Sequence, residues 1–250
     1  MLSIIIPVLN EEGTIESCLR RLQTLRGNDV EIILVDGGST DGTAGSARGL
    51  ADKVIDAPPG RARQMNAGAL EAKGSILLFL HADTILPVGA MQEMQTAIDR
   101  SRHVWGRFDV RIGSPLWILS VVAFAMNLRS RWTGIATGDQ AIFVKRTAFD
   151  EVGGYPAIAL MEDIALTSAL KRITPPICLR SKVTTSGRRW EKKRADPDDL
   201  ADVAPAARLL SWRGSKAISD RVHVWATSLN GRCNLRSSPR HPWPATRKRV

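Results

Sequence analysis

The stretch Ile76-Leu-Leu-Phe-Leu-His-Ala-Asp-Thr84 decides the fold of this chain. Five apolar residues run directly into a short polar segment that holds one carboxylate, Asp83. A short, continuous apolar run is typical of a strand buried on both faces of a sheet. A carboxylate just beyond the carboxyl end of such a strand lies where open α/β sheets bind ligands. The stretch therefore predicts either a metal-binding carboxylate at Asp83 or an aspartate that caps the next helix.

The first hundred residues alternate between strand and helix patterns. Short apolar runs predict strands at residues 2–8, 30–35, 53–56 and 75–80, and apolar residues at helical spacing predict helices at 15–25, 43–51, 61–72 and 91–98. Such alternation predicts an α/β fold, with a Rossmann-like, mostly parallel sheet flanked by helices on both faces. Further along, we expect a strand at 105–112, an apolar helix at 115–128, a loop at 129–137, a strand at 140–145, a helix at 162–172 and one or two strands at 177–185.

Charge is unevenly distributed along the 250 residues. The net charge of +10 is typical of proteins that bind nucleic acid or an anionic membrane surface. Residues 1–190, however, hold 22 Lys and Arg against 19 Asp and Glu, whereas residues 191–250 hold 13 against 6. We therefore expect a domain at 1–190 and an atypical basic, Pro/Arg-rich, partly disordered tail at 191–250. Because the basic excess belongs mainly to the tail, nucleic acid is not the expected partner of the domain.

Cysteine usage and hydropathy predict the compartment. Cys18, Cys178 and Cys233 are odd in number and far apart, which fits neither a disulfide framework nor a metal-ligand spacing. No basic segment precedes the first apolar run, which argues against a signal peptide. The longest apolar stretch, Pro115–Met126, is shorter than the ~20 residues that a membrane span needs. We expect a cytoplasmic protein with no transmembrane span.

Polar segments follow the first two predicted strands. Pro7-Val-Leu-Asn-Glu-Glu12 comes after the first strand, and its simpler role would be a turn in which Asn10 caps a helix. Asp36-Gly-Gly-Ser-Thr-Asp-Gly-Thr43 comes after the second strand. Its glycines would let a ligand approach the backbone, and Asp36 could accept hydrogen bonds from a base or ribose. An ordinary strand-to-helix turn is the alternative there.

Two further polar segments follow the next two strands. Gly60–Gly68 carries Arg61 and Arg63 near a helix N-terminus, which favours phosphate binding, although a solvated basic helix is the alternative. His81-Ala-Asp83 follows the strand quoted above. All four segments follow strands at the same edge of the predicted sheet. Together they predict a binding site for a nucleoside diphosphate, with a hard divalent cation on Asp83. The absence of a Walker-type loop and of G-x-G-x-x-G disfavours ATPases and dinucleotide enzymes.

Taken together, these motifs resemble those of a known family. The stretch from Ile4 to Trp190 resembles the inverting family 2 glycosyltransferases, which have the GT-A (nucleotide-diphospho-sugar transferase) fold. The matching segments are Pro7–Glu12, Asp36–Thr43, Gly60–Gly68, His81–Thr84, Gly138–Gln140 and Glu162–Asp163. A bacterial subgroup called transferase 2 is the most similar, because its further motifs stand here in the same order, at Gly138–Phe143, Gly153–Pro156, Met161–Asp163 and Arg188–Trp190.

The resemblance implies a role for each matched residue. It implies transfer of a sugar from a nucleoside-diphosphate sugar to an acceptor hydroxyl by a metal-assisted single displacement. Asp83 would hold Mg²⁺ or Mn²⁺, and Asp163, with Glu162 as the fallback, would be the general base. The donor would be bound by Pro7, Asn10, Glu12, Asp36, Asp41, Arg61, Arg63, Asn66 and Ala82. The acceptor side would comprise Trp132, Gly138, Asp139 and Gln140. From the residues alone, Glu162 and Asp163 could instead simply complement a helix dipole.

Two departures from the family pattern stand out. Most members carry D-x-D, whereas here His81 replaces the first acid. Members of the subgroup continue after R-R-W with an amphipathic helix, whereas here Glu191-Lys-Lys-Arg194 leads into unrelated Pro/Arg-rich sequence. We hypothesise a shifted reading frame, which resequencing of the 3′ end of the gene would test.

The acceptor and the binding partners are less directly indicated by the sequence than the donor. The apolar helix at Pro115–Leu128, with Arg129, Arg131 and Trp132 after it, could rest on the inner face of the cell membrane and admit a lipid-linked acceptor. A core helix, or a contact within a homodimer, is the simpler alternative for this segment. A nucleotidyltransferase of similar fold and a non-catalytic protein that binds anionic ligands or nucleic acid are the alternative functions.

Overall fold

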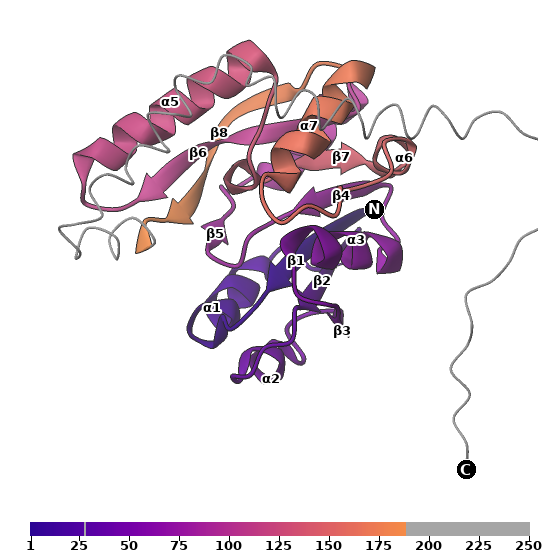
Figure 1. The fold of residues 1–250 in the computed structure, drawn as a ribbon, viewed down its shortest axis with the longest axis vertical. Helices are drawn as coiled ribbons and strands as arrows, with labels where there is room; N and C mark the ends of the chain where they lie inside the picture. The colour runs from indigo at the N-terminus through magenta and orange to yellow at the C-terminus, as the bar shows by residue number, and fades with distance from the viewer. Residues whose placement is uncertain (28, 189–250) are drawn as a thin grey trace, which may run out of the picture. The chain divides into compact units, whose positions relative to one another are not determined.

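The computed structural model describes residues 1–27 and 29–188, which build one sheet with helices on both of its faces (Figure 1). Within these residues the sheet has eight strands in the order β3-β2-β1-β4-β7-β6-β8-β5. The expected α/β architecture with a mostly parallel sheet is therefore confirmed: four of the seven strand pairings among these residues are parallel, and β7 runs antiparallel to both of its neighbours.

The first half of the sheet is parallel, as the sequence predicted. Its strands are β1 (Leu2–Val8), β2 (Val30–Asp36), β3 (Lys53–Asp56) and β4 (Ile76–Phe79). β1 pairs with β2 and β4, and β2 pairs with β3. The connecting helices are α1 (Glu12–Leu22), α2 (Thr43–Ala47) and α3 (Arg61–Glu71), and α4 (Ala90–Asp99) follows β4 and β5 (Thr84–Ile85). This arrangement brings the loops after β1 and β2 to the same sheet edge.

The second half is more irregular. Its elements are β6 (Trp105–Gly113), α5 (Trp117–Thr133), η1 (Gly138–Gln140, a 3₁₀ turn), β7 (Phe143–Lys145), α6 (Arg146–Glu151), α7 (Glu162–Ile173) and β8 (Ile177–Ser186). β8 is parallel to β6 and antiparallel to β5. The short β7 joins this half to β4.

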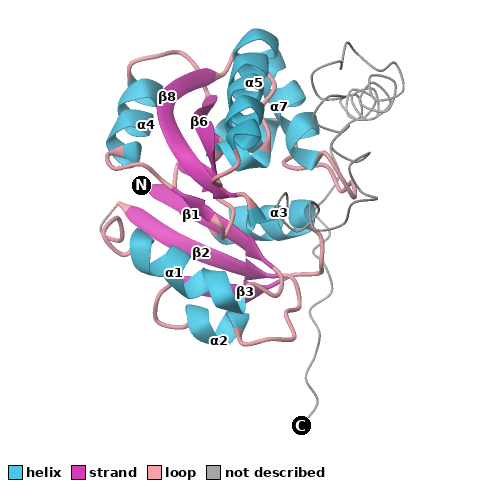
Figure 2. Cartoon of the chain, turned by 90° about the vertical axis from the view of Figure 1, so that its left-hand side faces the viewer, coloured by secondary structure: helices cyan, strands magenta, loops and turns pink. Residues whose placement is uncertain are grey.

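Apolar side chains form a core on each face of the sheet. On one face, Leu19 of α1, Met94 of α4 and Ala123 of α5 belong to one cluster with residues of the sheet. On the other, Met65 of α3, Phe149 of α6 and Leu166 of α7 belong to a second cluster. Figure 2 shows α1 and α3 on opposite sides of the parallel strands. β1 and β2 are buried on both faces of the sheet, which explains why their sequences are continuously apolar.

Several expectations need correction. α5 continues to Thr133, so the predicted loop at 129–137 starts too early. The predicted strand at 140–145 is a 3₁₀ turn followed by the shorter β7, and neither β5 nor α6 was expected. α5 is also not a wholly buried core helix, because Trp117 is 75% exposed and Phe124 is 67% exposed.

The expectations about the tail at 191–250, its frame and the end of the Arg188–Trp190 motif lie outside the described residues. Within the described part, no helix combines the length and the apolar character that crossing a bilayer demands.

Candidate active site

The loops that follow β1 and β2 are bound to each other. The backbone N–H of Asn10 donates to the Ser39 hydroxyl at 2.9 Å, and the Thr40 N–H donates to Asn10 Oδ1 at 2.9 Å. The Glu12 N–H donates to Asp41 Oδ2 at 3.2 Å. Asn10 has a φ of 54°, a left-handed conformation that asparagine tolerates better than most residues. The predicted donor-binding residues Asn10, Glu12 and Asp41 thus fix the shape of this edge.

Asp41 is held by the first turn of α2. Its carboxylate accepts the Thr43 N–H at 3.0 Å and also the Thr43 hydroxyl, which in turn accepts the Glu11 N–H at 2.8 Å. The Thr43 hydroxyl is the main cause that lowers the pKa of Asp41. The sequence predicted that Asp41 contacts the donor, and the structure gives it a clear positioning role.

Asp36 ends β2 and is buried at the same edge. Its Oδ1 accepts both the Ser39 N–H at 3.0 Å and the Ser39 hydroxyl at 2.6 Å. Beside it, Gln64 of α3 donates to the carbonyls of Val8 at 2.7 Å and Val35 at 3.0 Å, which locks the ends of the two strands together. Pro7 lies within β1, in register with Val35. Since Asp36 has further acceptor capacity, it remains suited to a base or ribose.

α3 connects the parallel half to the second half. Arg61 and Arg63 are exposed in its first turn. Arg61 lies 3.8 Å from Glu162 at the start of α7, with side chains 40% and 6% exposed respectively. Asn66, which the resemblance predicts at the donor, bonds twice to the backbone of Tyr155, at 2.8 and 2.9 Å. One helix therefore presents both arginines and anchors the turn that precedes α7.

Asp83 follows β4, with Ala82 buried before it. Among the residues that the structure describes, its Oδ1 accepts two long hydrogen bonds, at 3.5 Å each, from the hydroxyls of Thr84 and Thr185. The alternative role as a helix cap is wrong, because the next helix, α4, has Gly89 at its N-cap. Burial, with Asp83 as a secondary cause, raises the pKa of the Cys18 thiol to about 12. The Asp83 carboxylate is thus weakly engaged by the protein.

A single carboxylate fits one mode of cation binding. In residues 1–27 and 29–188, no cluster of three or more His, Cys, Asp or Glu side chains could hold a metal by itself. Mg²⁺ is commonly bound by one or two carboxylates together with substrate phosphates and water. Asp83, with its long hydroxyl contacts, suits that mode rather than a cage made wholly of protein ligands.

Antiparallel pairing brings His81 to η1. β4 and β7 pair with Leu78 opposite Phe143, and continuing this register by three positions puts His81 opposite Gln140. His81 Nδ1 lies 3.3 Å from Asp139 Oδ1. A Cβ on Gly138 would lie 2.6 Å from His81 Nε2, so only glycine lets the imidazole approach this closely. Gly138 and Asp139, which the resemblance predicts on the acceptor side, are therefore in contact with His81, the residue that replaces the first acid of D-x-D.

Asp163 reaches the same point from α7. Its Oδ2 accepts the Gly138 N–H at 2.7 Å and its Oδ1 accepts the Ile164 N–H at 2.7 Å. A carboxylate offers about four acceptor positions, so these bonds orient it without exhausting it. Glu162, by contrast, is buried and faces Arg61. Asp163 is consequently the better placed of the two acids to receive a proton.

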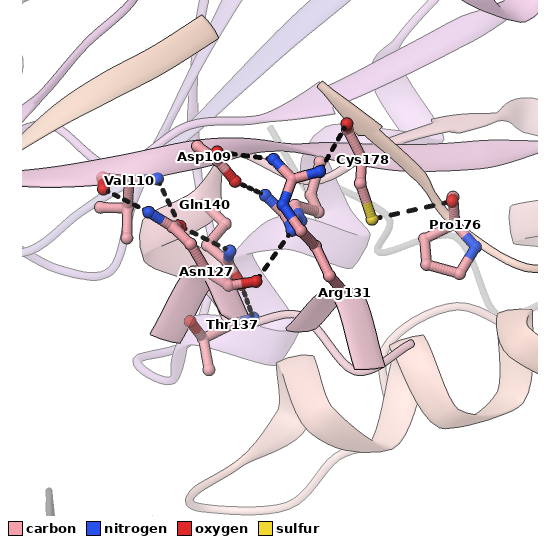
Figure 3. Close-up of polar contacts among 9 residues, drawn as sticks. Asp109, Val110, Asn127, Arg131, Thr137, Gln140, Pro176 and Cys178 are labelled. Carbon is pink, nitrogen blue, oxygen red and sulfur yellow. Dashed lines mark hydrogen bonds and ion pairs between the residues drawn. The ribbon is translucent and has the colours of Figure 1, made fainter. Parts of the chain in front are cut away.

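The other two residues predicted on the acceptor side, Gln140 and Trp132, lie in different surroundings. Gln140 is fully buried and joins a polar network that also includes Asn127 and Val110 (Figure 3). Its Nε2 donates to Asn127 Oδ1 at 3.4 Å and its Oε1 accepts the Thr137 N–H at 3.3 Å. These bonds of Gln140, the last residue of η1, hold the 3₁₀ turn in place. Trp132 is 79% exposed near the end of α5.

Tyr155 has no role that its place in the Gly-Gly-Tyr-Pro turn predicts from the sequence. Burial is the main cause that raises the pKa of its phenol, and Asp163 and Glu162 add to the effect. Its backbone bonds with Asn66 join α3 to the turn before α7. The aromatic residue in the Gly-Gly-Tyr-Pro turn was the available signal, but neither its burial nor the Asn66 pairing can be read from a sequence.

Much of the chain is similar in sequence to a known family and to named proteins. Residues 3–156 match the family model "Glycosyl transferase family 2". The chain is 41% identical over 170 residues to a PGL/p-HBAD biosynthesis glycosyltransferase of Mycobacterium bovis, covering 62% of this chain and 63% of that protein. It is 25% identical over 154 residues to the undecaprenyl-phosphate 4-deoxy-4-formamido-L-arabinose transferase of Klebsiella pneumoniae, covering 57% and 47%. The chain thus spans less than two thirds of the length of these relatives.

Solved structures share the fold. TarS of S. aureus, residues 1–349 in complex with UDP-GlcNAc, superposes with a TM-score of 0.60 at 18% identity, covering 74% of this chain and 58% of that chain. Glucosyl-3-phosphoglycerate synthase of Mycobacterium tuberculosis, in complex with Mg²⁺ and uridine diphosphate, superposes with a TM-score of 0.55 at 19% identity, covering 74% and 70%. The expected GT-A fold is confirmed by these likenesses.

Proposed function

Because the chain belongs to glycosyl transferase family 2, we propose that it moves a sugar from a nucleoside-diphosphate sugar to an acceptor hydroxyl with inversion at the anomeric carbon. The family match and the likeness to a named glycosyltransferase support glycosyl-transfer chemistry over the alternative of a nucleotidyltransferase. The order of its motifs supports membership of the transferase 2 subgroup. One observation carries the mechanism: the Asp163 carboxylate is fixed on the Gly138 N–H, beside the His81–Asp139 pair.

The donor would lie over the ends of β1 and β2. Asp36 is buried there and has acceptor capacity for the nucleobase or ribose, in a frame made rigid by Gln64 and the bonded loops. Arg61 and Arg63, exposed in the first turn of α3, would meet the negative charge of the diphosphate. TarS and the mycobacterial synthase were crystallised with UDP-GlcNAc and uridine diphosphate, so UDP-sugars are the first donors to test.

Asp83 would hold the divalent cation. A bound Mg²⁺ or Mn²⁺ supplies Lewis-acid stabilisation of the charge that develops on the leaving diphosphate. The long contacts of Asp83 with the Thr84 and Thr185 hydroxyls leave its carboxylate able to take part. Its neighbour His81 is committed to Asp139, which favours a role for His81 on the acceptor side of the site.

Asp163 would act as general base. An acceptor hydroxyl that attacks the anomeric carbon must lose its proton, and a carboxylate within hydrogen-bond reach can take it. The Gly138 and Ile164 N–H groups orient Asp163, and its remaining lone pairs could accept the hydroxyl. A single displacement of this kind needs no protein nucleophile.

The acceptor would be lipid-linked and reached at a membrane surface. Trp117, Val121, Phe124 and Trp132 are exposed and recur along α5 at helical spacing. α5 carries no acidic residue, and its cations are Arg129 and Arg131. An apolar stripe on a helix without acidic residues suits a membrane interface, even though Arg131 is paired with Asp109 and two nitrogens of Arg129 are buried. α5 ends just before η1, so a lipid held along it would have its head group near Gly138.

Transfer assays with the full chain test the reaction. UDP-sugars are supplied with Mn²⁺ and a polyprenol or glycolipid acceptor, and NMR reads the anomeric configuration of the product. Asp163→Asn should lower kcat by about 10²–10⁴-fold, and it should also lower the melting temperature somewhat, because the asparagine NH2 cannot accept one of the two backbone N–H groups that Asp163 binds. Asp150→Asn, an exposed acid on α6, is the matched control and should be fully active. A retained anomeric configuration, or full activity of Asp163→Asn, would overturn the mechanism.

Vesicle flotation tests the membrane role separately. The full chain should float with phosphatidylglycerol vesicles and less with phosphatidylcholine vesicles, and Phe124→Ser should weaken the binding. If the protein is a dimer in solution that buries α5 and does not bind vesicles, membrane docking is refuted. The exposed face of α5 would then be a contact between two copies of the chain.

A further inference from the structure

Glu162 is a buried acid that the mechanism above does not use. It is the first residue of α7 and is 5% exposed. Its ion-pair partner is Arg61 of α3, with Arg61 Nη1 3.8 Å from Glu162 Oε1. That separation is longer than a hydrogen bond. Among the residues that the structure describes, no donor forms a hydrogen bond with the Glu162 carboxylate.

A second buried glutamate of the chain is bonded in a different way. Glu31 of β2 is 7% exposed, and its carboxylate accepts both the Ser3 hydroxyl and the Lys73 N–H. Glu162 is as deeply buried but has only the more distant guanidinium. Burial of an ionised carboxylate without hydrogen bonds is costly, and an unsatisfied polar group of this kind calls for a functional reason. The missing partner of Glu162 therefore indicates a ligand.

The backbone just before Glu162 is strained. Met161 holds the N-cap position of α7 with a φ of 64°, a left-handed conformation that is rare for a bulky side chain. Glycine or asparagine would adopt it at a lower cost. Such outliers cluster at active sites and ligand contacts. The strain at Met161 is thus a second observation that points to the start of α7 as a segment that contacts a ligand.

The gap between the two charged groups suits one hydroxyl. A hydroxyl has one hydrogen to donate and two lone pairs with which to accept. At a distance of ~2.8 Å from each partner, it can donate to Glu162 Oε1 and accept from Arg61 Nη1, because these two atoms are 3.8 Å apart. A phosphate in the same place would be repelled by Glu162, and a cation would be repelled by Arg61. The pair therefore favours a neutral group that both donates and accepts.

The position of the pair indicates which hydroxyl it binds. Arg61 begins α3, whose first turn would meet the donor diphosphate, and Glu162 directly precedes Asp163, the proposed base. The sugar that is transferred must lie between the diphosphate and the acceptor hydroxyl that the base deprotonates. We propose that Glu162, together with Arg61, binds one ring hydroxyl of the transferred sugar and so determines donor specificity. This inference rests on the proposed transferase function and names the part of the donor that Glu162 recognises.

Calorimetric titration of the full chain with Mn²⁺ tests the proposal. The ligands are UDP, UDP-glucose, UDP-galactose and UDP-GlcNAc. Glu162→Ala should not weaken the binding of UDP. It should raise the Kd of the UDP-sugar that the wild type binds most tightly by about tenfold to a hundredfold, the usual worth of a hydrogen bond to a charged group. One monodeoxy analogue of that sugar nucleotide should show the same loss with the wild type. Glu162→Ala should bind this analogue and the parent equally well.

Glu31→Gln is the matched control. It weakens the bonds to Ser3 and Lys73, so it should lower the melting temperature and leave every Kd unchanged. If Glu162→Ala behaves like Glu31→Gln, the gap holds water, Glu162 is structural and the proposal fails. An equal loss for UDP and for the UDP-sugars would also overturn it, in favour of a role in nucleotide binding. A wild type that binds a UDP-sugar but transfers no sugar would instead refute the proposed transferase function, while the Kd values still measure the role of Glu162.

Discussion

Replacing Gly138 with alanine is the sharpest test of the site geometry. The added Cβ would lie 2.6 Å from Nε2 and 2.8 Å from Cε1 of His81, and 3.7 Å from Asp163 Oδ2. Ordinary contact begins at 3.4 Å, so either the imidazole or the turn must move by about 0.8 Å. Movement of the imidazole would break the His81–Asp139 pair, and movement of the turn would lengthen the Gly138–Asp163 hydrogen bond.

The expected effect follows from the size of that shift. A misplacement of about 1 Å near reacting groups can cost about a hundredfold in rate, equivalent to ~2.7 kcal/mol of transition-state stabilisation. Steady-state transfer at saturating donor and acceptor should therefore show kcat reduced about a hundredfold. Overpacking should lower the free energy of unfolding by about 1–3 kcal/mol, which urea titration measures.

Two controls isolate the cause. Gly45 lies in α2, and a Cβ added there would meet only open space, so Gly45→Ala should be fully active and slightly more stable. His81→Ala removes the clashing ring, so the double variant with Gly138→Ala should be no slower than His81→Ala alone. A Gly138→Ala enzyme with kcat within threefold of the wild type would refute the contact geometry described here.

Three further expectations concern residues around the site. Asn66→Ala removes both bonds to the Tyr155 backbone and should lower the free energy of unfolding by about 1–3 kcal/mol in urea titration, and a loss below ~0.5 kcal/mol would contradict this. Because the pKa of Cys18 is raised to about 12, iodoacetamide at pH 8.5 should label Cys178 well before Cys18 in peptide mapping, and equal labelling would disprove the burial. Since the pKa of Asp41 is lowered from 3.8, its ionised form adds stability that is present above pH 3.8 and lost as pH falls through the lower folded value. The destabilisation by Asp41→Asn at pH 6 should accordingly shrink below pH 3.8, and a difference independent of pH would count against the Thr43 interaction.

The parallel half of the sheet could be predicted because its signals are local. β1 and β2 are apolar runs bounded by polar turns, and α1 shows regular helical spacing, so each element is defined by its own residues. Strand order in such a unit follows from connection rules rather than from distant contacts. The position of Asp36 at the end of β2 and of Asp83 beyond β4 could therefore be predicted from the sequence.

The antiparallel half could not be predicted in the same way. β7 has three residues, which is too short for any periodicity, and its place between β4 and β6 depends on contacts with distant segments. The extension of α5 through Arg129 to Thr133 was missed because charged and aromatic residues end the apolar run there. Without β7, nothing in the sequence indicates that His81 meets Asp139.

The hydrogen bonds of the polar residues distinguish those that stabilise the site from those that can act on a substrate. Asn10, Asn66 and Gln140 direct their amide groups at other parts of the protein, so their type is explained by the frame that they maintain. Asp163 differs, because two backbone N–H groups fix its orientation and leave acceptor positions in reserve. A motif match cannot make this distinction, because both kinds of residue are needed for the same reaction. The division therefore predicts that substitutions of the amide residues act mainly through stability, and that substitutions of Asp163 act through kcat.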